Sequence, residues 1–164
     1  MKKFVDATTG QMIKVSNTVL SHFDRFRQSS SKSKEAGGQL FALIDGNIIF
    51  IEQATGPRRS DRRTPLSFIP NRLAERREIR RLFKKGFHYV GDWHTHPEAQ
   101  PRPSSTDEHS INESFRKSRH QLDSFILAIV GTDPFPSGLF IGVTDGKSLT
   151  RLTPNQSPER VDSL

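Results

Sequence analysis

Short apolar runs alternate with amphipathic segments along this chain, and their order predicts a mixed α/β fold. The runs that are rich in β-branched and aromatic residues are typical of strands. They cover residues 12–15, 38–44, 47–53, 66–69, 88–94, 124–130, 139–144 and 148–152. Asp45-Gly46 is a strong hairpin signal, so the second and third runs are expected to pair through it.

Three segments have the spacing of amphipathic helices. One follows a cap at Ser16 or Asn17, a second begins at Asn71 and ends at Gly86, and a third covers about residues 105–119. The apolar sides of the first two are Val19, Leu20, Phe23 and Phe26, and Leu73, Ile79, Leu82 and Phe83. This mixed order predicts a single mixed-sheet domain with flanking helices, although periodicity does not give the strand order.

Length and composition set the size and surroundings of this domain. With 164 residues, of which 32% are hydrophobic, the chain suits one domain with a modest core. We expect the domain over residues 1–152 and a disordered tail over residues 153–164. The absence of cysteine excludes disulfides, a thiol protease and cysteine-ligated zinc. Because we find no signal peptide and no apolar run of membrane-spanning length, the expected location is cytoplasmic, without a membrane partner.

The segment 91–97, Gly-Asp-Trp-His-Thr-His-Pro, carries the clearest candidate chemistry. Side chains alternate along a strand, so His94 and His96 project to one face at the spacing that two ligands of one ion need. Overlapping capping signals at residues 104–108 place Asp107 in the first turn of a helix. Two imidazoles and one carboxylate leave a position of a divalent metal open for water, which is typical of a catalytic site.

Glu35 is the candidate acid and base. It precedes Ala-Gly-Gly at the entrance of the strand 38–44. Metal-bound water needs a base to take its proton and an acid to protonate the leaving amine, and one glutamate can do both in sequence. The alternative is a solvated charge at a strand entrance, but the two glycines indicate that backbone approaches closely here. The combination predicts a hydrolase.

Glu35, His94, His96, Ser104 and Asp107 resemble the JAMM motif of the JAB/MPN-domain zinc metallopeptidases, E-x(n)-H-[S/T]-H-x(7)-S-x-x-D, at every specified position. The strings Glu-Ala-Gly-Gly-Gln-Leu-Phe-Ala and Gly-Asp-Trp-His-Thr-His-Pro-Glu resemble the small stand-alone bacterial branch. The resemblance covers roughly residues 10–150. It implies the cytidine-deaminase-like MPN fold, with the metal at the end of a central strand.

The same resemblance implies a role for each motif residue. His94, His96 and Asp107 would hold zinc, Glu35 would move the proton, and Ser104 would donate to the scissile carbonyl or its oxyanion. Because no motif residue is missing, we expect an active zinc metalloprotease of the isopeptidase type. A catalytically inactive JAB-like binding module is the alternative.

The resemblance also implies partners. Members of the branch occur beside ubiquitin-type activating and conjugating enzymes, including in anti-phage signalling operons built around a nucleotidyltransferase. The implied substrate is a protein with an extended C-terminal tail, either a ubiquitin-like protein or a conjugated nucleotidyltransferase, cut after its last residue in deconjugation or in precursor processing. Such a tail would fit beside a sheet edge by strand addition.

The charge balance raises a third function. There are 25 Lys and Arg residues against 18 Asp and Glu, which gives a net charge of +7 and is compatible with nucleic-acid binding. Aromatic residues that could stack on bases are scarce, with Tyr89 and Trp93 besides phenylalanines that suit core faces. The basic loop 56–65 is either a docking surface for an acidic protein or only solvent-facing.

Two further residues lie near the motif in the sequence. Asp92 shares the strand face of His94 and His96. There it would either accept a hydrogen bond from a ligand histidine and so orient it, or cap a local backbone group. His109 follows Asp107 by two residues and is a candidate outer-shell group.

Overall fold

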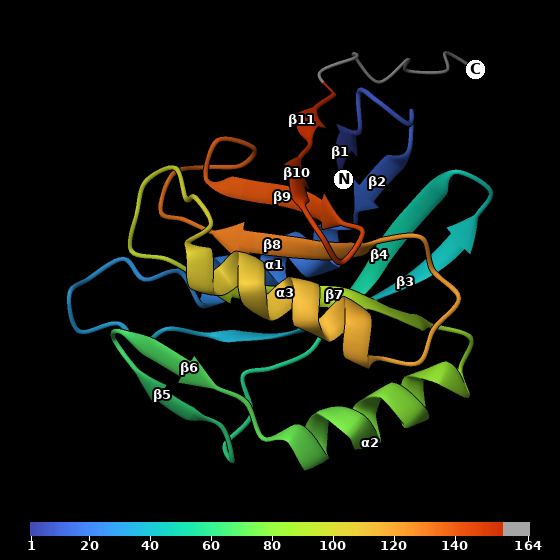
Figure 1. The fold of residues 1–164 in the computed structure, drawn as a ribbon. Helices are drawn as coiled ribbons and strands as arrows, with labels where there is room; N and C mark the ends of the chain where they lie inside the picture. Colours follow the sequence, from blue (N-terminus) through green and yellow to red (C-terminus); the bar gives the residue numbers. More distant parts are fainter. Residues whose placement is uncertain (156–164) are drawn as a thin grey trace, which may run out of the picture.

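The computed structural model describes residues 1–155, and these form a mixed sheet with helices on both faces (Figure 1). The sheet strands are β1 (Lys2–Val5), β2 (Met12–Val15), β3 (Gly37–Asp45), β4 (Ile48–Ala54), β7 (His88–Thr95), β8 (Phe125–Val130), β9 (Leu139–Thr144), β10 (Leu149–Arg151) and β11 (Thr153–Pro154). Their order is β10-β9-β8-β7-β3-β4-β2-β1-β11, with β3 in the middle and β7 beside it. Neighbours are antiparallel except for the parallel pairs β2 with β4 and β7 with β8. A separate hairpin consists of β5 (Arg62–Thr64) and β6 (Ser67–Ile69).

Three helices complete the described part of the chain: α1 (Asn17–Arg25), α2 (Arg72–Phe83) and α3 (Ser105–Lys117). In Figure 1, α3 crosses in front of the sheet and α1 lies behind it, whereas α2 lies near β7 and β3 below α3. None of these helices is long and apolar enough to cross a membrane.

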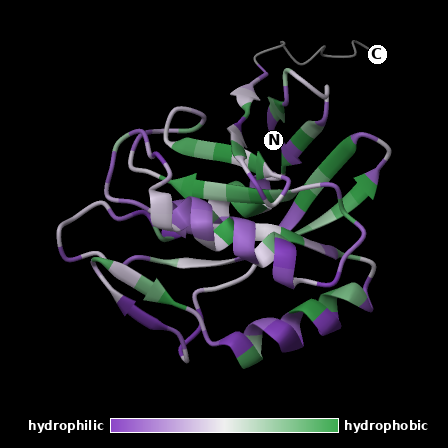
Figure 2. Ribbon diagram, in the orientation of Figure 1, coloured by the Kyte–Doolittle hydropathy of each residue, from purple (hydrophilic) through white to green (hydrophobic). Residues whose placement is uncertain are grey.

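Apolar residues are common in β8 and β9, which are largely green in Figure 2, and buried apolar side chains lie on both faces of the sheet. On one face, Ser16 caps α1 by accepting from the Val19 N–H at 3.2 Å, and α1 buries Val19, Leu20 and Phe23 against the sheet. On the other face, Ile111 of α3 packs on residues of β8 and β9. Each fully buried side chain of this size stabilises the fold by about 1.5–3 kcal/mol. The two layers fix β7 and α3, the elements that carry the motif.

A bulge in β7 decides which of its side chains face α2 and α3. Leu40 pairs with Gly91 and Phe41 with Tyr89, so Val90 has no partner on β3. Gly91 has φ +150, and a Cβ there would lie 1.8 Å from the carbonyl oxygen of Ile126. The extra residue reverses the alternation of side chains along β7, so Tyr89 and Asp92, three positions apart, lie on the same face. Tyr89 donates to Asp92 at 2.8 Å.

The predicted fold class, a single mixed sheet with flanking helices, is confirmed, as is the hairpin of β3 and β4 through Asp45-Gly46. The expected apolar side of α2 is wrong in part: Leu82 is buried as expected, but Leu73 is 63% exposed, Phe83 is 64% exposed, and Glu75 is buried. The reason is that α2 contacts the sheet mainly at β7 and β3, so only one narrow side of the helix is covered.

Two strands and the end of the domain also differ from the sequence expectation. Residues 62–64 of the basic loop form β5, and Lys2–Val5 form a strand that the sequence did not predict. We expected the domain to end at residue 152, but Thr153 and Pro154 pair with Val5 and Phe4. The rest of the predicted tail, residues 156–164, lies outside the described residues.

Candidate metal centre and catalytic pocket

His94, His96 and Asp107 bring three donor atoms together at the end of β7. The two histidine Nε2 atoms are 3.1 Å apart. Asp107 places Oδ1 3.2 Å from His94 Nε2 and Oδ2 3.3 Å from His96 Nε2. A tetrahedral ion with ligands at about 2.0–2.1 Å separates its ligand atoms by roughly 3.3 Å. The donor set therefore fits a metal ion of this kind, and among residues 1–155 it is the group whose ligand atoms all converge within 4.8 Å.

Asp107 is held by the first turn of α3. Ser104 is the N-cap, and its hydroxyl accepts from the Asp107 N–H at 3.1 Å. In return, Asp107 Oδ2 accepts from the Ser104 N–H at 2.8 Å. Of the two overlapping capping signals in the sequence, the chain uses the one at Ser104, and this capping box fixes the carboxylate toward the histidines.

The electrostatics of the three residues favour an ionised carboxylate. Burial by itself raises the pKa of Asp107, but hydrogen bonds from His94 and His96 outweigh it and hold that pKa far below its usual range. Burial lowers the pKa of His96, and the bond to Asp107 reverses this, so the net shift is upward. A bound metal cation would likewise favour the ionised form of the Asp107 carboxylate, with the cation in place of the protons that the histidines donate.

Glu35 lies in the same pocket, two residues before β3. Burial raises the pKa of its carboxyl above the ordinary value, against the pull of His94 and His96. Its backbone is held against the β5–β6 hairpin. The Glu35 N–H donates to the Thr64 carbonyl at 2.8 Å, and the Glu35 carbonyl accepts from Arg63 Nε at 2.8 Å.

The close backbone approach expected at Gly37 and Gly38 is confirmed. A Cβ on Gly38 would lie 1.7 Å from the Thr55 carbonyl oxygen, and one on Gly37 would lie 2.7 Å from the Phe68 ring. Gly37 pairs with His94 across the β3–β7 ladder. The two glycines thus allow β3, β7 and the hairpin to meet beside the candidate ligands.

A buried polar network that the sequence analysis missed joins Glu35 to the histidine strand. Thr95 Oγ1 accepts from the Ala36 N–H at 3.0 Å and donates to Gln28 Oε1 at 2.8 Å. Gln28 Nε2 in turn donates to the carbonyls of Ser33 and Pro65. The signal in the sequence was a hydroxyl residue between the two histidines, but its partners lie far away along the chain.

A cavity of about 470 Å³ contains the candidate residues. Glu35, His94, His96, Ser104 and Asp107 line it on one side, and Leu66, Ser67 and Phe68 of the hairpin line another. Arg72, Glu75 and Asp92 also line it. The Ser104 hydroxyl accepts from the Asp107 N–H, which leaves its own proton available to an oxygen in the cavity.

The structure separates the two outer residues named from the sequence. Asp92 lines the cavity, but its oxygens accept from Tyr89 at 2.8 Å and from Ser114 at 3.4 Å, so these hydroxyls rather than a histidine ring satisfy it. Burial raises the pKa of Asp92. His109 is 70% exposed in its side chain and lies 3.7 Å from Glu113, and it is absent from the residues that line the cavity.

Glu98 is a residue near the site that the sequence analysis did not single out. His96 Nδ1 is buried and has no hydrogen-bond partner among the described residues, and Glu98 Oε1 lies 3.7 Å from it. Glu98 Oε2 accepts from the Arg102 N–H at 3.2 Å, which holds the side chain in the loop after β7. The outer nitrogen of a ligand histidine usually donates to such a carboxylate.

A His-His-Asp set and a half-buried glutamate around one cavity, on a mixed α/β fold, define a metal-dependent hydrolase of the peptidase class. Residues 20–142 match the model of a family described as prokaryotic homologs of the JAB domain. The chain belongs to this family.

Several relatives agree with this assignment. A "CD-NTase/cGAS isopeptidase" of Pseudomonas aeruginosa is 31% identical over 73% of this chain and 77% of its own. One of Escherichia coli with the same name is 28% identical over 80% of this chain and 76% of its own. A "probable metalloprotease" of Sinorhizobium fredii is 36% identical over 50% of this chain and 53% of its own.

The solution structure of a protein from Desulfitobacterium hafniense has the same fold, with a TM-score of 0.60, 20% sequence identity, and coverage of 85% of this chain and 89% of that one. The chain is therefore a JAB-type hydrolase with isopeptidase or peptidase activity that depends on a metal ion.

Proposed function

We propose that this protein is a zinc-dependent isopeptidase that cuts after the C-terminal residue of a conjugated protein. The convergence of His94, His96 and Asp107 beside Glu35 in one cavity is the observation that carries the proposal. Zinc is favoured over other metals because two imidazoles and one carboxylate at this spacing suit a tetrahedral ion with an open position.

Each side chain has a defined task. A bound zinc ion would lower the pKa of a coordinated water toward neutrality and polarise the scissile carbonyl. Glu35 takes a proton from the attacking water and passes it to the departing amine, for which a raised pKa is favourable. Ser104 donates its hydroxyl proton to the oxygen that becomes negative in the transition state.

The proposed substrate is the C-terminal tail of a bacterial nucleotidyltransferase, or of a ubiquitin-like protein, joined to an amine by a conjugation system. Relatives from four genera carry the name CD-NTase/cGAS isopeptidase, which supports the nucleotidyltransferase. The lining of the cavity supports an extended tail: it includes the metal centre and residues of β6, whose outer edge pairs with no other strand of the described chain. A tail can pair with such an edge through its backbone. The activating and conjugating enzymes of the same operon are the proposed partners in the pathway.

The test uses a CD-NTase fused through its C-terminal residue to green fluorescent protein, together with CD-NTase conjugates from cells. Purified protein is expected to carry zinc at about one ion per chain and to release the CD-NTase with its native last residue. His94→Ala should lose both zinc and cleavage. His109→Ala is the matched control, because this exposed histidine lies away from the cavity, and it should retain both.

Three results would contradict the proposal. Protein without stoichiometric metal, or cleavage that survives both chelator and the Glu35→Ala substitution, would exclude a metallopeptidase. Binding of the tail that chelator does not affect, without cleavage, would instead indicate an inactive binding module. Tight, steeply salt-dependent binding to nucleic acid with no cleavage would instead indicate a nucleic-acid-binding protein.

A further inference from the structure

The outward side of α2 carries a dense group of positive charges. Residues 72–85 contain seven of the 25 Lys and Arg residues of the chain, against two Glu. We call the exposed members that form no ion pair with a described residue the basic face of α2; they are Arg76, Arg77, Arg80, Arg81, Lys84 and Lys85. Within residues 1–155, the ion pairs of α2 are those of Arg72 with Glu75 and Arg58 with Glu78, so the basic face has no acidic partner in the described chain.

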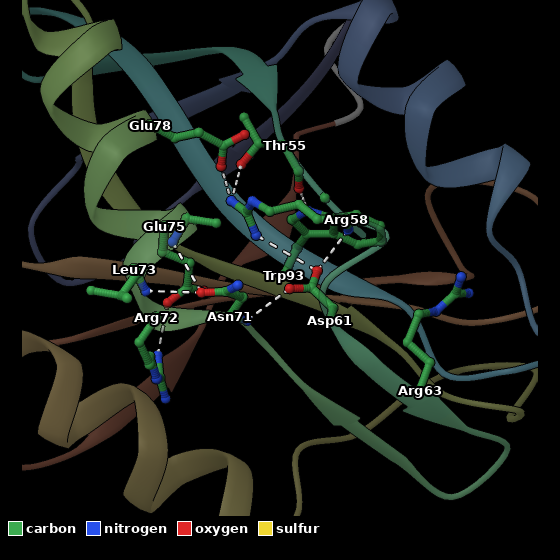
Figure 3. A network of polar contacts seen from close by, with 12 residues as sticks. Thr55, Arg58, Asp61, Arg63, Asn71, Arg72, Leu73, Glu75, Glu78 and Trp93 are labelled. Atoms are coloured by element: carbon green, nitrogen blue, oxygen red, sulfur yellow. Dashed lines mark hydrogen bonds and ion pairs between the residues drawn. The ribbon is translucent and has the colours of Figure 1, made fainter.

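Both glutamates of α2 point inward, which leaves the outer side with one sign of charge. Glu75 is only 6% exposed and binds Arg72 at 3.0 Å. Glu78 forms an ion pair with Arg58, whose guanidinium also contacts Thr55 and Asp61 (Figure 3). The like charges on such a helix face repel one another, and binding of an acidic partner would reduce this repulsion.

The loop 56–65, by contrast, uses much of its charge inside the molecule. Arg58 lies between Glu78 of α2 and Asp61, as Figure 3 shows, and Arg63 donates to the carbonyl of Glu35. Of the two readings of this loop, docking surface or solvent-facing segment, neither describes Arg58 and Arg63. The loop keeps two exposed arginines, Arg59 and Arg62, whereas the basic face of α2 has six exposed basic residues, so the larger group of unpaired charges lies on α2.

Apolar side chains accompany the basic face. Leu73 is 63% exposed and Phe83 is 64% exposed, at the two ends of α2, and Ile69 at the end of β6 is 56% exposed. Protein interfaces combine exposed apolar residues with arginine, whereas contact with phosphates needs only the charge. This combination favours a protein partner over nucleic acid.

The first turn of α2, which precedes the basic face, lines the cavity. Pro70, Arg72 and Glu75 line the cavity, and α2 then leads away from it over about 18 Å to Lys84 (Figure 1). A protein whose tail occupies the cavity must place its folded part near the cavity mouth. The basic face is a surface that this folded part can reach.

We propose that the basic face of α2 docks an acidic surface on the folded protein whose C-terminal tail enters the cavity. The inference rests on the proposed isopeptidase function and adds a second point of recognition to it. The tail then supplies the bond to be cut, and α2 selects and holds the protein that carries the tail. Attraction between such surfaces acts mainly on association and on KM rather than on the chemical step.

The test compares two substrates that share one scissile bond. The first is the CD-NTase fusion that the wild-type protein cleaves, and the second is a short peptide of the tail joined to a fluorescent amine, which lacks the folded part that is proposed to dock on α2. The variant Arg76→Glu with Arg80→Glu reverses two charges of the basic face. The matched control, Arg119→Glu with Lys147→Glu, makes the same change in net charge at exposed positions outside α2.

We expect the α2 variant to raise KM for the fusion about tenfold or more, with kcat and peptide cleavage unchanged. The control variant should match the wild type on both substrates. Added salt, from about 50 mM to about 500 mM, should raise KM of the wild type for the fusion and have less effect on the α2 variant. Thermal unfolding of both variants checks that the fold is retained.

Each other outcome overturns the inference in a distinguishable way. Equal kinetics of the α2 variant and wild type on the fusion, or equal losses on fusion and peptide, would show that the basic face does not dock the substrate. Binding of a fluorescent single-stranded or double-stranded oligonucleotide that the α2 variant abolishes, with fusion kinetics unchanged, would assign the face to nucleic acid. Cleavage of neither substrate by the wild type would remove the proposed function and this inference with it.

Discussion

Thr95, the residue between the two candidate ligand histidines, accepts a 3.0 Å hydrogen bond from the backbone N–H of Ala36, the residue after Glu35. The Thr95 N–H also donates to the Ala36 carbonyl at 2.9 Å. One side-chain bond and one backbone bond therefore join the strand that presents His94 and His96 to the segment that presents Glu35.

The first prediction concerns Thr95 itself. Thr95→Val keeps the shape but removes the hydroxyl, which leaves the Ala36 N–H and Gln28 Oε1 without their partner in a fully buried place. We expect a loss of about 1–3 kcal/mol in the free energy of unfolding and a fall in kcat. Thr95→Ser should restore both, measured by urea unfolding and by cleavage of the fusion. A fully active Thr95→Val protein would show that the side-chain bond is not needed.

The second prediction separates chemistry from metal binding. Glu35→Gln preserves size and hydrogen bonding but cannot accept a proton, so kcat should fall by about 10²–10⁴-fold. Because Glu35 is not one of the three converging ligands, zinc content should not change. Activity within a factor of about ten of the wild type would rule out Glu35 as the general base.

The third prediction concerns the two tasks of Ser104. Ser104→Ala removes the N-cap of α3, worth about 1 kcal/mol of stability, and also removes the proposed oxyanion donor. The expected fall in kcat, about 10²–10³-fold, is larger than the loss of the cap explains. Ser16→Ala on α1 is a matched cap control, since Ser16 also accepts a backbone N–H but lies outside the cavity. It should lower stability alone.

The fourth prediction assigns Glu98 a positioning role through His96 Nδ1. Glu98→Gln retains an acceptor for the Arg102 N–H but removes the charge 3.7 Å from the ring nitrogen. Zinc affinity, measured by competition with a fluorescent chelator, should fall about 10–100-fold. Glu108→Gln, at an exposed position on α3, is the control and should bind zinc as the wild type does. Equal affinities for all three proteins would contradict the assignment.

The fifth prediction concerns pH. Burial, and then the neighbouring Asp92 carboxylate, raise the pKa of Glu75 above its ordinary value of 4.5. Between 4.5 and the raised pKa the folded state binds more protons than the unfolded state, so this contribution to stability is present below pH 4.5 and is lost as pH rises through the folded pKa.

Glu75→Gln abolishes this titration. Relative to the wild type, the free energy of unfolding of the variant should improve as pH rises from about 4 to about 7. The lost ion pair with Arg72 offsets little of this, because the Arg72 side chain is 70% exposed. Urea unfolding of both proteins across this range gives the measurement, and a constant difference between them would disprove the shift.

The sequence by itself determined the features that depend on neighbouring residues. Strand alternation put His94 and His96 on one face, the signal at Ser104 and Asp107 built the capping box, and Asp45-Gly46 made a hairpin. Each of these follows from backbone geometry within one or two turns of chain, which is why periodicity and spacing sufficed.

Only the tertiary structure decided the relations between distant segments. Ala36 and Thr95 are 59 positions apart, and Gln28 and Thr95 are 67 apart, so no local pattern reports their bonds. The side of α2 that faces inward was predicted only in part, because burial of Glu75 depends on which strands the helix meets rather than on its own apolar residues. The candidate residues of the reaction could therefore be identified from the sequence. Long-range packing determines their arrangement, their supporting contacts and the position of the basic face of α2.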